Sequence, residues 1–131
     1  MGACAHNPHL QTATDMSYTI GTQCFDLWVR WPGDSVERSM PVRFTRDRVF
    51  EDAHYTNRVD LLSMHNPMYH AWWDPLTADS IAVTFVAVDS GLRFRLGRVR
   101  SDTLRGTVRW NGVDDEAPGL PVTGVRQACG G

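Results

Sequence analysis

The sequence predicts an all-β protein folded as an antiparallel up-and-down β-barrel of about eight strands. The main observation concerns residues 79–111, where three successive runs alternate apolar with polar side chains. Alternation with a period of two predicts strands that bury one face and expose the other. The runs are separated by Asp89-Ser90-Gly91 and Ser101-Asp102, short turns that are typical of antiparallel neighbours. Several short strands joined in this way hide their edges when the sheet closes into a barrel.

The chain is expected to divide into a flexible N-terminal segment, residues 1–17, and a single barrel domain, residues 18–131. The N-terminal segment contains a proline, two histidines and small polar residues without any periodicity. Residues 18–31 are expected to form the first strand of the barrel. Side chains of one parity in this strand face the interior. These are Phe25, Leu27, Val29 and Trp31.

Further strands are expected on both sides of the central meander. Residues 40–44 alternate in polarity and predict the second strand, residues 46–48 (Arg-Asp-Arg) a tight turn, and residues 49–50 the third strand. A last strand is expected over residues 121–127. The segment between the third strand and the central meander, residues 51–75, mixes aromatic side chains with histidine and is the least strand-like part of the chain. We expect functional residues there.

The charge balance argues against nucleic acid as a partner. The chain has 13 basic and 15 acidic residues and a formal net charge of −2, whereas phosphate binding requires clustered positive charge. The basic residues are arginines, and those that alternate along strands are expected to form a solvated, salt-bridged outer face. No apolar run approaches the roughly 18 residues of a membrane span. The first residues have neither a basic region nor an apolar stretch, so a cytoplasmic location is slightly favoured.

Three cysteines, Cys4, Cys24 and Cys129, are far apart and lack the spacing of a metal site. In a reducing compartment they would remain thiols, which is the more common state of widely separated cysteines. In an oxidising compartment Cys24 would pair with Cys129, because closure of the meander brings the first and last strands together. The sequence leaves both alternatives open.

The interior of a barrel of about eight strands is either filled by side chains or holds one small ligand. The expected interior and rim are rich in aromatic side chains and have few polar anchors, as small-molecule sites usually do. We therefore expect non-covalent binding of a small hydrophobic or aromatic molecule, although a filled barrel remains an open alternative. The expected ligand-binding residues are Trp31, Phe44, Tyr69, His70, Trp73, Phe85, Phe94 and Trp110.

The last strands also carry a resemblance to a known family. Gly97-Arg98-Val99, residues 102–108 (DTLRGTV) and Gly124-Val125-Arg126 follow a pattern of two glycine-containing strands before a final strand that ends in a small residue and an arginine. In this pattern the chain resembles small bacterial lipocalin-like barrels of the calycin type, over about residues 24–127. The resemblance implies an up-and-down barrel that is open at one end and binds small apolar molecules.

A second hypothesis makes the barrel a small enzyme of isomerase or cyclase type. His70 with Asp74 or Asp60, and with Tyr69 or Tyr55, would lie at the mouth, since a histidine beside a carboxylate can move protons on a bound ligand. The likeness to barrel enzymes is one of fold alone. The sequence has no nucleophile elbow and no phosphate-binding glycine loop. The spacing of His54, His65 and His70 does not favour metal binding, so no metal and no cofactor are expected.

A third hypothesis treats the protein as an interaction module whose barrel is filled. Adjacent residues on a strand point to opposite faces, so one of Trp72 and Trp73 enters the barrel and the other lies outside. An outward tryptophan at this position, together with Trp28, would form an exposed aromatic patch of the kind that marks interfaces. This hypothesis predicts a homodimer without an internal ligand.

Overall fold

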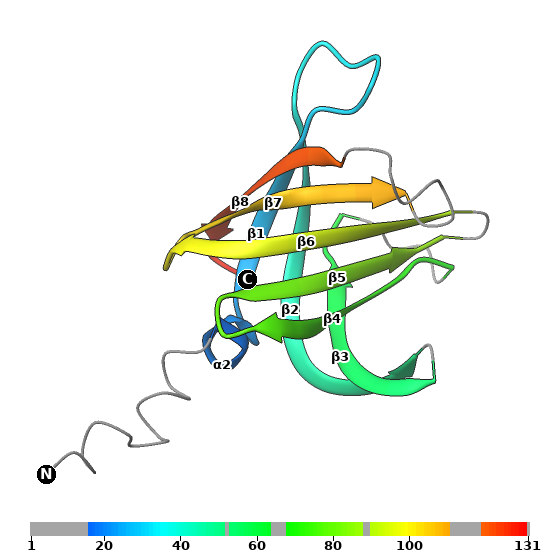
Figure 1. The fold of residues 1–131 in the computed structure, drawn as a ribbon, viewed down its shortest axis with the longest axis vertical. Helices are drawn as coiled ribbons and strands as arrows, with labels where there is room; N and C mark the ends of the chain where they lie inside the picture. The colour runs from blue at the N-terminus through cyan, green and yellow to red at the C-terminus, as the bar shows by residue number, and fades with distance from the viewer. Residues whose placement is uncertain (1–15, 52, 64–67, 88–89, 111–118, 131) are drawn as a thin grey trace, which may run out of the picture.

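The computed structural model describes residues 16–51, 53–63, 68–87, 90–110 and 119–130. Within them the chain forms a closed barrel of eight antiparallel strands that neighbour one another in sequence order (Figure 1). The last strand pairs with the first, which closes the sheet. The predicted all-β, up-and-down barrel is therefore confirmed.

The strands run alternately up and down, so their ends gather at two ends of the barrel. One short helix, α2 (Met16–Ile20), precedes them. The end of the barrel beside α2 is called the closed end below, and the opposite end, where β1 finishes and β6 begins, is called the open end. The strands are β1 (Cys24–Val29), β2 (Arg38–Glu51), β3 (His54–Leu61), β4 (His70–Thr77), β5 (Ser80–Val86), β6 (Gly91–Arg100), β7 (Thr103–Trp110) and β8 (Leu120–Gln127).

The predicted meander at residues 79–111 corresponds to β5, β6 and β7. Val83, Phe94 and Val108 lie side by side in the register of these strands, and all three are buried. Their neighbours in sequence on β6, Arg93 and Arg95, are exposed. The period-two pattern therefore assigned the inner and outer faces of this part of the barrel correctly.

Strand β2 differs from the prediction. The expected turn at residues 46–48 is part of one continuous strand of 14 residues, whose register with β3 shifts between Phe44 and Arg48. Such a bulge places extra residues on one strand and strengthens its twist. Residues 49–50 are therefore the end of β2, and the third strand is β3. The β2–β3 hairpin curls away from the rest of the barrel (Figure 1).

Residues 16–20 form α2 instead of the start of the first strand, which begins at Cys24. Met16 and Ile20 are only 1% and 2% exposed, and the amide of Met16 donates a 2.7 Å hydrogen bond to the carbonyl of Ala78 in the β4–β5 turn. The helix thus covers the closed end with apolar side chains, and the expected domain boundary after residue 17 falls inside it. Among the described residues, no helix has the length and apolar character that a membrane crossing requires.

Cys24 and Cys129 form a disulfide, with their Cα atoms 5.1 Å apart. The bond joins the start of β1 to the residues after β8, positions that are 105 residues apart in sequence. It therefore fastens together the two strands whose pairing closes the barrel. Of the two alternatives that the sequence leaves open, the structure has the one expected for an oxidising compartment. Cys4 lies outside the described residues.

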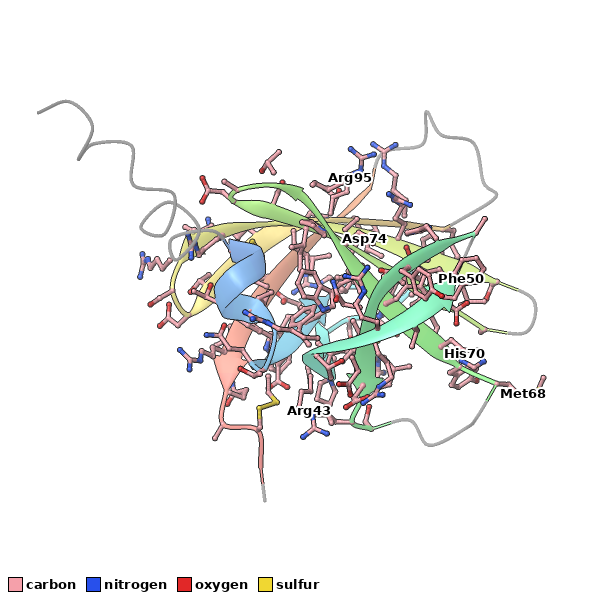
Figure 2. All side chains as sticks on the ribbon, turned by 90° about the horizontal axis from the view of Figure 1, so that it is seen from below. Arg43, Phe50, Met68, His70, Asp74 and Arg95 are labelled. Atoms are coloured by element: carbon pink, nitrogen blue, oxygen red, sulfur yellow. A yellow bond between two sulfur atoms is a disulfide. The ribbon has the colours of Figure 1, made fainter. Side chains whose placement is uncertain are left out.

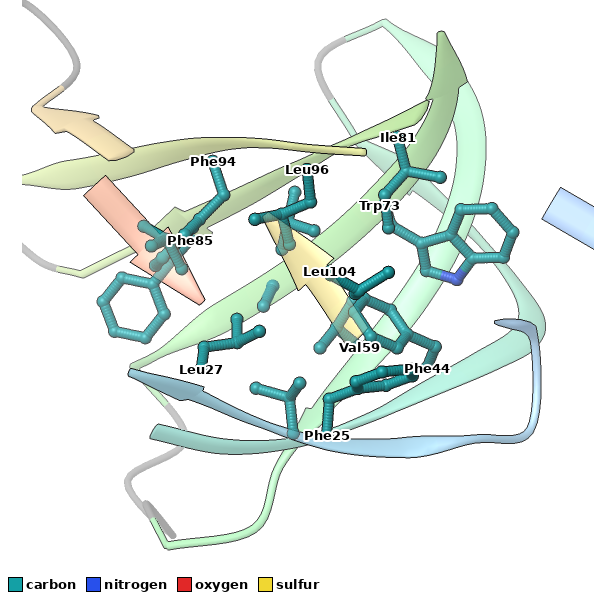
Figure 3. Close-up of a cluster of buried hydrophobic side chains, with 14 of the residues drawn as sticks. Phe25, Leu27, Phe44, Val59, Trp73, Ile81, Phe85, Phe94, Leu96 and Leu104 are labelled. Atoms are coloured by element: carbon teal, nitrogen blue, oxygen red, sulfur yellow. The ribbon is translucent and has the colours of Figure 1, made fainter. Parts of the chain in front are cut away.

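The interior toward the closed end is solid. Phe44 packs edge-to-face against Phe25 and Trp73, with ring centroids 5.8 Å and 6.3 Å apart. The indole nitrogen of Trp73 donates a 2.8 Å hydrogen bond to the carbonyl of Thr45, which satisfies the one polar group of this buried ring. Figure 3 shows these rings together with Leu104 in the buried cluster inside the barrel. Aromatic packing therefore fills this half of the interior.

Candidate ligand site at the open end of the barrel

A pocket of about 230 Å³ enters the barrel at its open end. Its walls come from β1 and β2 on one side and from β5 and β6 on the other, strands that face each other across an eight-stranded barrel. This pocket is called the mouth pocket below. Its apolar lining is Leu27, Val29, Trp31, Met40, Phe85, Leu92 and Phe94, and Arg38 and Ser39 complete it.

The strand period places the apolar lining on the inside. On β6, Leu92 and Phe94 face inward while Arg93 between them is exposed. Phe94 has no exposed surface and forms the floor of the mouth pocket, next to the solid half of the core. In Figure 3, Phe85 and Phe94 lie on one side of the buried cluster and Trp73 on the other. The barrel is thus hollow toward one end and filled toward the other.

The rim of the mouth pocket carries two tryptophans and one fixed charge. Trp31 lines the pocket and packs edge-to-face against Trp110, with ring centroids 5.5 Å apart. Trp110 is 40% exposed and supports Trp31 from outside the lining. The Nε of Arg38 donates a 2.9 Å hydrogen bond to Asp34, so its guanidinium is held at the rim. The pocket therefore has an apolar wall and a polar edge, as ligand sites usually do.

Two of the residues expected to bind a ligand lie elsewhere. Phe44 is completely buried and Trp73 is 2% exposed, and both belong to the aromatic packing of the closed half. The structure thus brings Trp31, Phe85 and Phe94 together in the mouth pocket, with Trp110 behind Trp31. Phe44 and Trp73 pack inside the barrel nearer its closed end, where side chains fill the interior.

Tyr69 and His70 lie beside a second pocket, of about 270 Å³, in the seam between β3 and β4. These strands share only two register pairs, Asn57 with Trp73 and Arg58 with Trp72, which leaves the seam open beyond them. The ring of Tyr69 contacts Phe85 of the mouth pocket, with centroids 5.7 Å apart. Tyr69 therefore separates the two pockets.

An ion-pair network borders the second pocket. Asp60 accepts hydrogen bonds from Arg58 at 2.8 Å and from Arg43 at 3.0 Å, and Arg58 also pairs with Asp47 at 2.8 Å. Partial burial by itself raises the pKa of Asp60, but the hydrogen bonds from Arg58 and Arg43 outweigh it and hold that pKa below its ordinary value. The hydrogen bond to Asp60 in turn raises the pKa of Arg58. Asp60 therefore stays ionised and occupied by its arginine partners.

The acid–base pair of the enzyme hypothesis is not formed. His70 is exposed and directed away from the barrel (Figure 2). Asp74 instead accepts a 2.7 Å hydrogen bond from Thr56 and lies 3.3 Å from the Nε2 of His54, which ties the start of β3 to β4. Among the described residues, no group of three or more histidine, cysteine or carboxylate side chains is placed to hold a metal ion. His65 lies outside the described residues.

The outward tryptophan of the dimer hypothesis is covered. Trp72 points away from the interior, as its parity relative to Trp73 predicts, yet it is only 7% exposed. Thr84, which lies opposite Trp72 on the neighbouring strand β5, is also buried on this outer face. Trp72 therefore offers little surface to a second copy of the chain.

The prediction from the sequence did not include the aliphatic residues that line the mouth pocket. Val29 and Leu92 have the parity of interior residues, and Met40 stands on the second predicted strand. The predicted ligand-binding set consists of phenylalanine, tyrosine and tryptophan side chains with His70, although aliphatic residues of the same parity near the same strand ends were an available signal. Arg38 and Ser39 gave no such signal, because they lie outside the predicted strand.

Comparison with known proteins finds no protein family, no curated protein and no solved structure that matches the chain. The class of protein is therefore given by the fold and the site. It is a closed, eight-stranded antiparallel barrel that is covered at one end by a helix and bears a pocket at the other.

Proposed function

We propose that the protein binds a small apolar or aromatic molecule, without covalent chemistry, in the mouth pocket. The observation that supports this most strongly is a pocket of about 230 Å³ with seven apolar lining residues, directly next to a core that is otherwise packed. Protein interiors are close-packed, and a space of this size loses contacts that a bound molecule would restore.

The size of the pocket limits the ligand. Sites for drug-sized molecules typically measure about 300–1,000 Å³, and an apolar cavity of about 150 Å³ holds one benzene. A volume of about 230 Å³ therefore fits a compound of one or two rings, or a short branched hydrocarbon. Trp31 and Phe85 supply ring surfaces on which a flat ligand would pack.

The resemblance to lipocalin-like barrels belongs to this proposal. It is supported by the up-and-down order of eight closed strands and by an apolar pocket that enters the barrel at its open end. Homodimerisation and catalysis by His70 are not part of the proposal, because Trp72 is covered and because Asp74 pairs with His54.

The test is a titration followed by thermal unfolding, with indole and 2-naphthol as neutral probes. A ligand that binds only the folded protein stabilises it by about 2.7 kcal/mol at a concentration of 100 times its Kd. We expect a saturable rise in Tm and a saturable change in tryptophan fluorescence, because Trp31 lines the pocket.

A pair of matched variants assigns the effect to the mouth pocket. Leu92→Phe adds a ring to the lining and should abolish the rise in Tm, whereas Leu76→Phe, at a 43% exposed position on β4, should leave it intact. An equal response of both variants, or the absence of any saturable response in the unaltered protein, would refute the proposal.

A further inference from the structure

The barrel wall is divided by charge. Strands β1–β4 contain five arginines and five carboxylates. Strands β5–β8 contain seven arginines and neither aspartate nor glutamate. The strands of this half of the barrel are therefore basic, although the turns between them carry carboxylates such as Asp79 and Asp102. The seven arginines are Arg93, Arg95, Arg98, Arg100, Arg105, Arg109 and Arg126.

Four of these arginines form a continuous outer surface, which we call the basic wall: Arg93, Arg95, Arg105 and Arg109. They alternate with core residues on β6 and β7, and all four are exposed. Arg93 lies directly opposite Arg109 in the strand register. Neighbouring strands are about 4.8 Å apart, and alternate residues along a strand are about 7 Å apart. The basic wall therefore presents several guanidinium groups close together.

Three of the four guanidinium groups have no acidic partner among the described residues. In the part of the chain that the structure describes, Arg93, Arg95 and Arg105 have no carboxylate at salt-bridge distance. Arg43 and Arg58 share Asp60, and Figure 2 shows Arg43 and Arg95 on opposite sides of the barrel. The expected salt-bridged outer face thus exists on β2 and β3 but not at these three positions. Like charges directly opposite destabilise a sheet, a cost that a bound anion would offset.

We propose that the basic wall binds an acidic polysaccharide, a flexible chain that carries carboxylate or sulfate groups. A guanidinium donates two parallel hydrogen bonds to such groups. Thr107 and Thr123 stand opposite Arg95 and Arg105 in the register, and their hydroxyls suit the hydroxyl groups of sugars. The wall is the outside of a barrel and therefore convex, so a flexible chain follows it better than a flat bilayer does.

Two further observations favour a polysaccharide over a nucleic acid. Binding of single strands combines positive charge with aromatic side chains on which bases stack. The residues of β5–β8 that share the outward parity of the basic wall include no aromatic side chain, and the exposed Trp110 at the end of β7 has the inward parity and packs against Trp31. The Cys24–Cys129 disulfide is typical of proteins outside reducing compartments. This surface is separate from the mouth pocket, so the inference does not depend on the proposed function.

The test measures binding of a fluorescein-labelled heparin oligosaccharide by anisotropy. Affinity should fall as NaCl is raised from about 50 mM to about 200 mM, because binding releases counterions. Arg93→Gln with Arg95→Gln should weaken binding about tenfold or more, since each arginine near an anionic surface adds to the affinity. Circular dichroism should show an unchanged barrel, because both side chains are exposed.

The control variant removes two positive charges from a part of the barrel outside the basic wall. Arg30→Gln with Arg48→Gln alters two exposed arginines outside β5–β8 and should change the affinity less than about twofold. Equal losses in both double variants would show a dependence on net charge alone and overturn the proposal, as would failure of the oligosaccharide to bind at low salt. Tighter binding of an oligodeoxythymidylate or of phosphatidylglycerol vesicles, lost in the Arg93/Arg95 variant, would overturn the assignment to a polysaccharide.

Discussion

Gly106 shows how single residues set the spacing of the barrel strands. A Cβ atom built at this position would fall on the backbone carbonyl of Arg95 in the neighbouring strand β6. A backbone group cannot turn aside as a flexible side chain can, so the strands would have to move apart. Glycine within a strand often marks such a close approach. At Gly97, by contrast, the nearest atoms would lie 3.7 Å away, which is ordinary contact.

Alanine substitutions at these two glycines should therefore have different effects. We expect Gly106→Ala to lower the free energy of unfolding by about 2 kcal/mol or more, because overpacking forces backbone shifts. Gly97→Ala should change it by less than about 0.5 kcal/mol, as substitutions without such strain usually do. Urea denaturation of the two variants measures both values. Equal losses would contradict the close approach at Gly106.

Sequence reasoning predicted part of the mouth pocket because parity tells which side chains face inward. Trp31, Phe85 and Phe94 were selected in this way, and they line the mouth pocket. Phe44 has the same inward parity but packs against Trp73 in the solid half. Parity does not give the level of a residue along the barrel axis, which depends on the register between strands. For this reason the sequence left open whether the barrel was hollow.

At the scale of elements, the pairing of β2 with β3 includes an ionic ladder. Arg43 on β2 lies opposite Asp60 on β3, and Arg58 stands two residues before Asp60 on the same strand. Opposite charges directly across a strand pair stabilise a sheet. Because the pKa of Asp60 is lowered in the folded protein, this contribution is complete above the ordinary carboxyl pKa. It is lost as the pH falls through the lowered value.

Asp60→Asn should therefore lower stability in a pH-dependent way. We expect a loss of about 1 kcal/mol near neutral pH, since exposed ion pairs contribute little each. The loss should begin to shrink as the pH falls below about 4, the ordinary carboxyl pKa, and should vanish below the lowered pKa of Asp60 in the folded protein. Urea denaturation between acidic and neutral pH measures the difference. Asp102→Asn is the control, because Asp102 forms no ion pair with the described residues. A loss independent of pH would contradict the account.

Elements with clear alternation were predictable, and two elements without it were not. Strands β5–β7 keep their large apolar side chains on one parity over most of their length, and their existence and facing were predicted correctly. The arginine–aspartate run at residues 46–48 interrupts the alternation and resembles a turn, whereas the structure accommodates it as a bulge. Helix α2 is only five residues long, which is too short for a helical period to emerge from the sequence. Its role depends on contacts with the β4–β5 turn, which are not local in sequence.

For the whole molecule, closure depends on joining the first and last strands. The Cys24–Cys129 disulfide holds this junction across a sequence separation of 105 residues. In the chain-entropy account, a crosslink that closes a loop of about 100 residues stabilises the fold by about 4.7 kcal/mol, and measured values are typically about 2–4 kcal/mol. The bond is therefore expected to supply a large share of the stability of a domain of this size.

Replacing both bridged cysteines by serine should lower the free energy of unfolding by about 3 kcal/mol. Calorimetry should show a matching fall in Tm, and a reducing agent should lower the Tm of the unaltered protein in the same way. Cys4→Ser serves as the control and should leave the Tm unchanged. An unchanged Tm in the doubly substituted protein would show that strand pairing alone closes the barrel.

The barrel is hollow at its open end and filled by side chains toward its closed end. Methyl NMR during a titration with 2-naphthol tests this arrangement most directly. We expect saturable shifts at the methyl groups of Val29 and Leu92, which line the mouth pocket, and none at Leu96 or Leu104, which are 1% and 2% exposed within the core. Shifts of similar size at all four residues, or no saturable shift at any of them, would contradict the account.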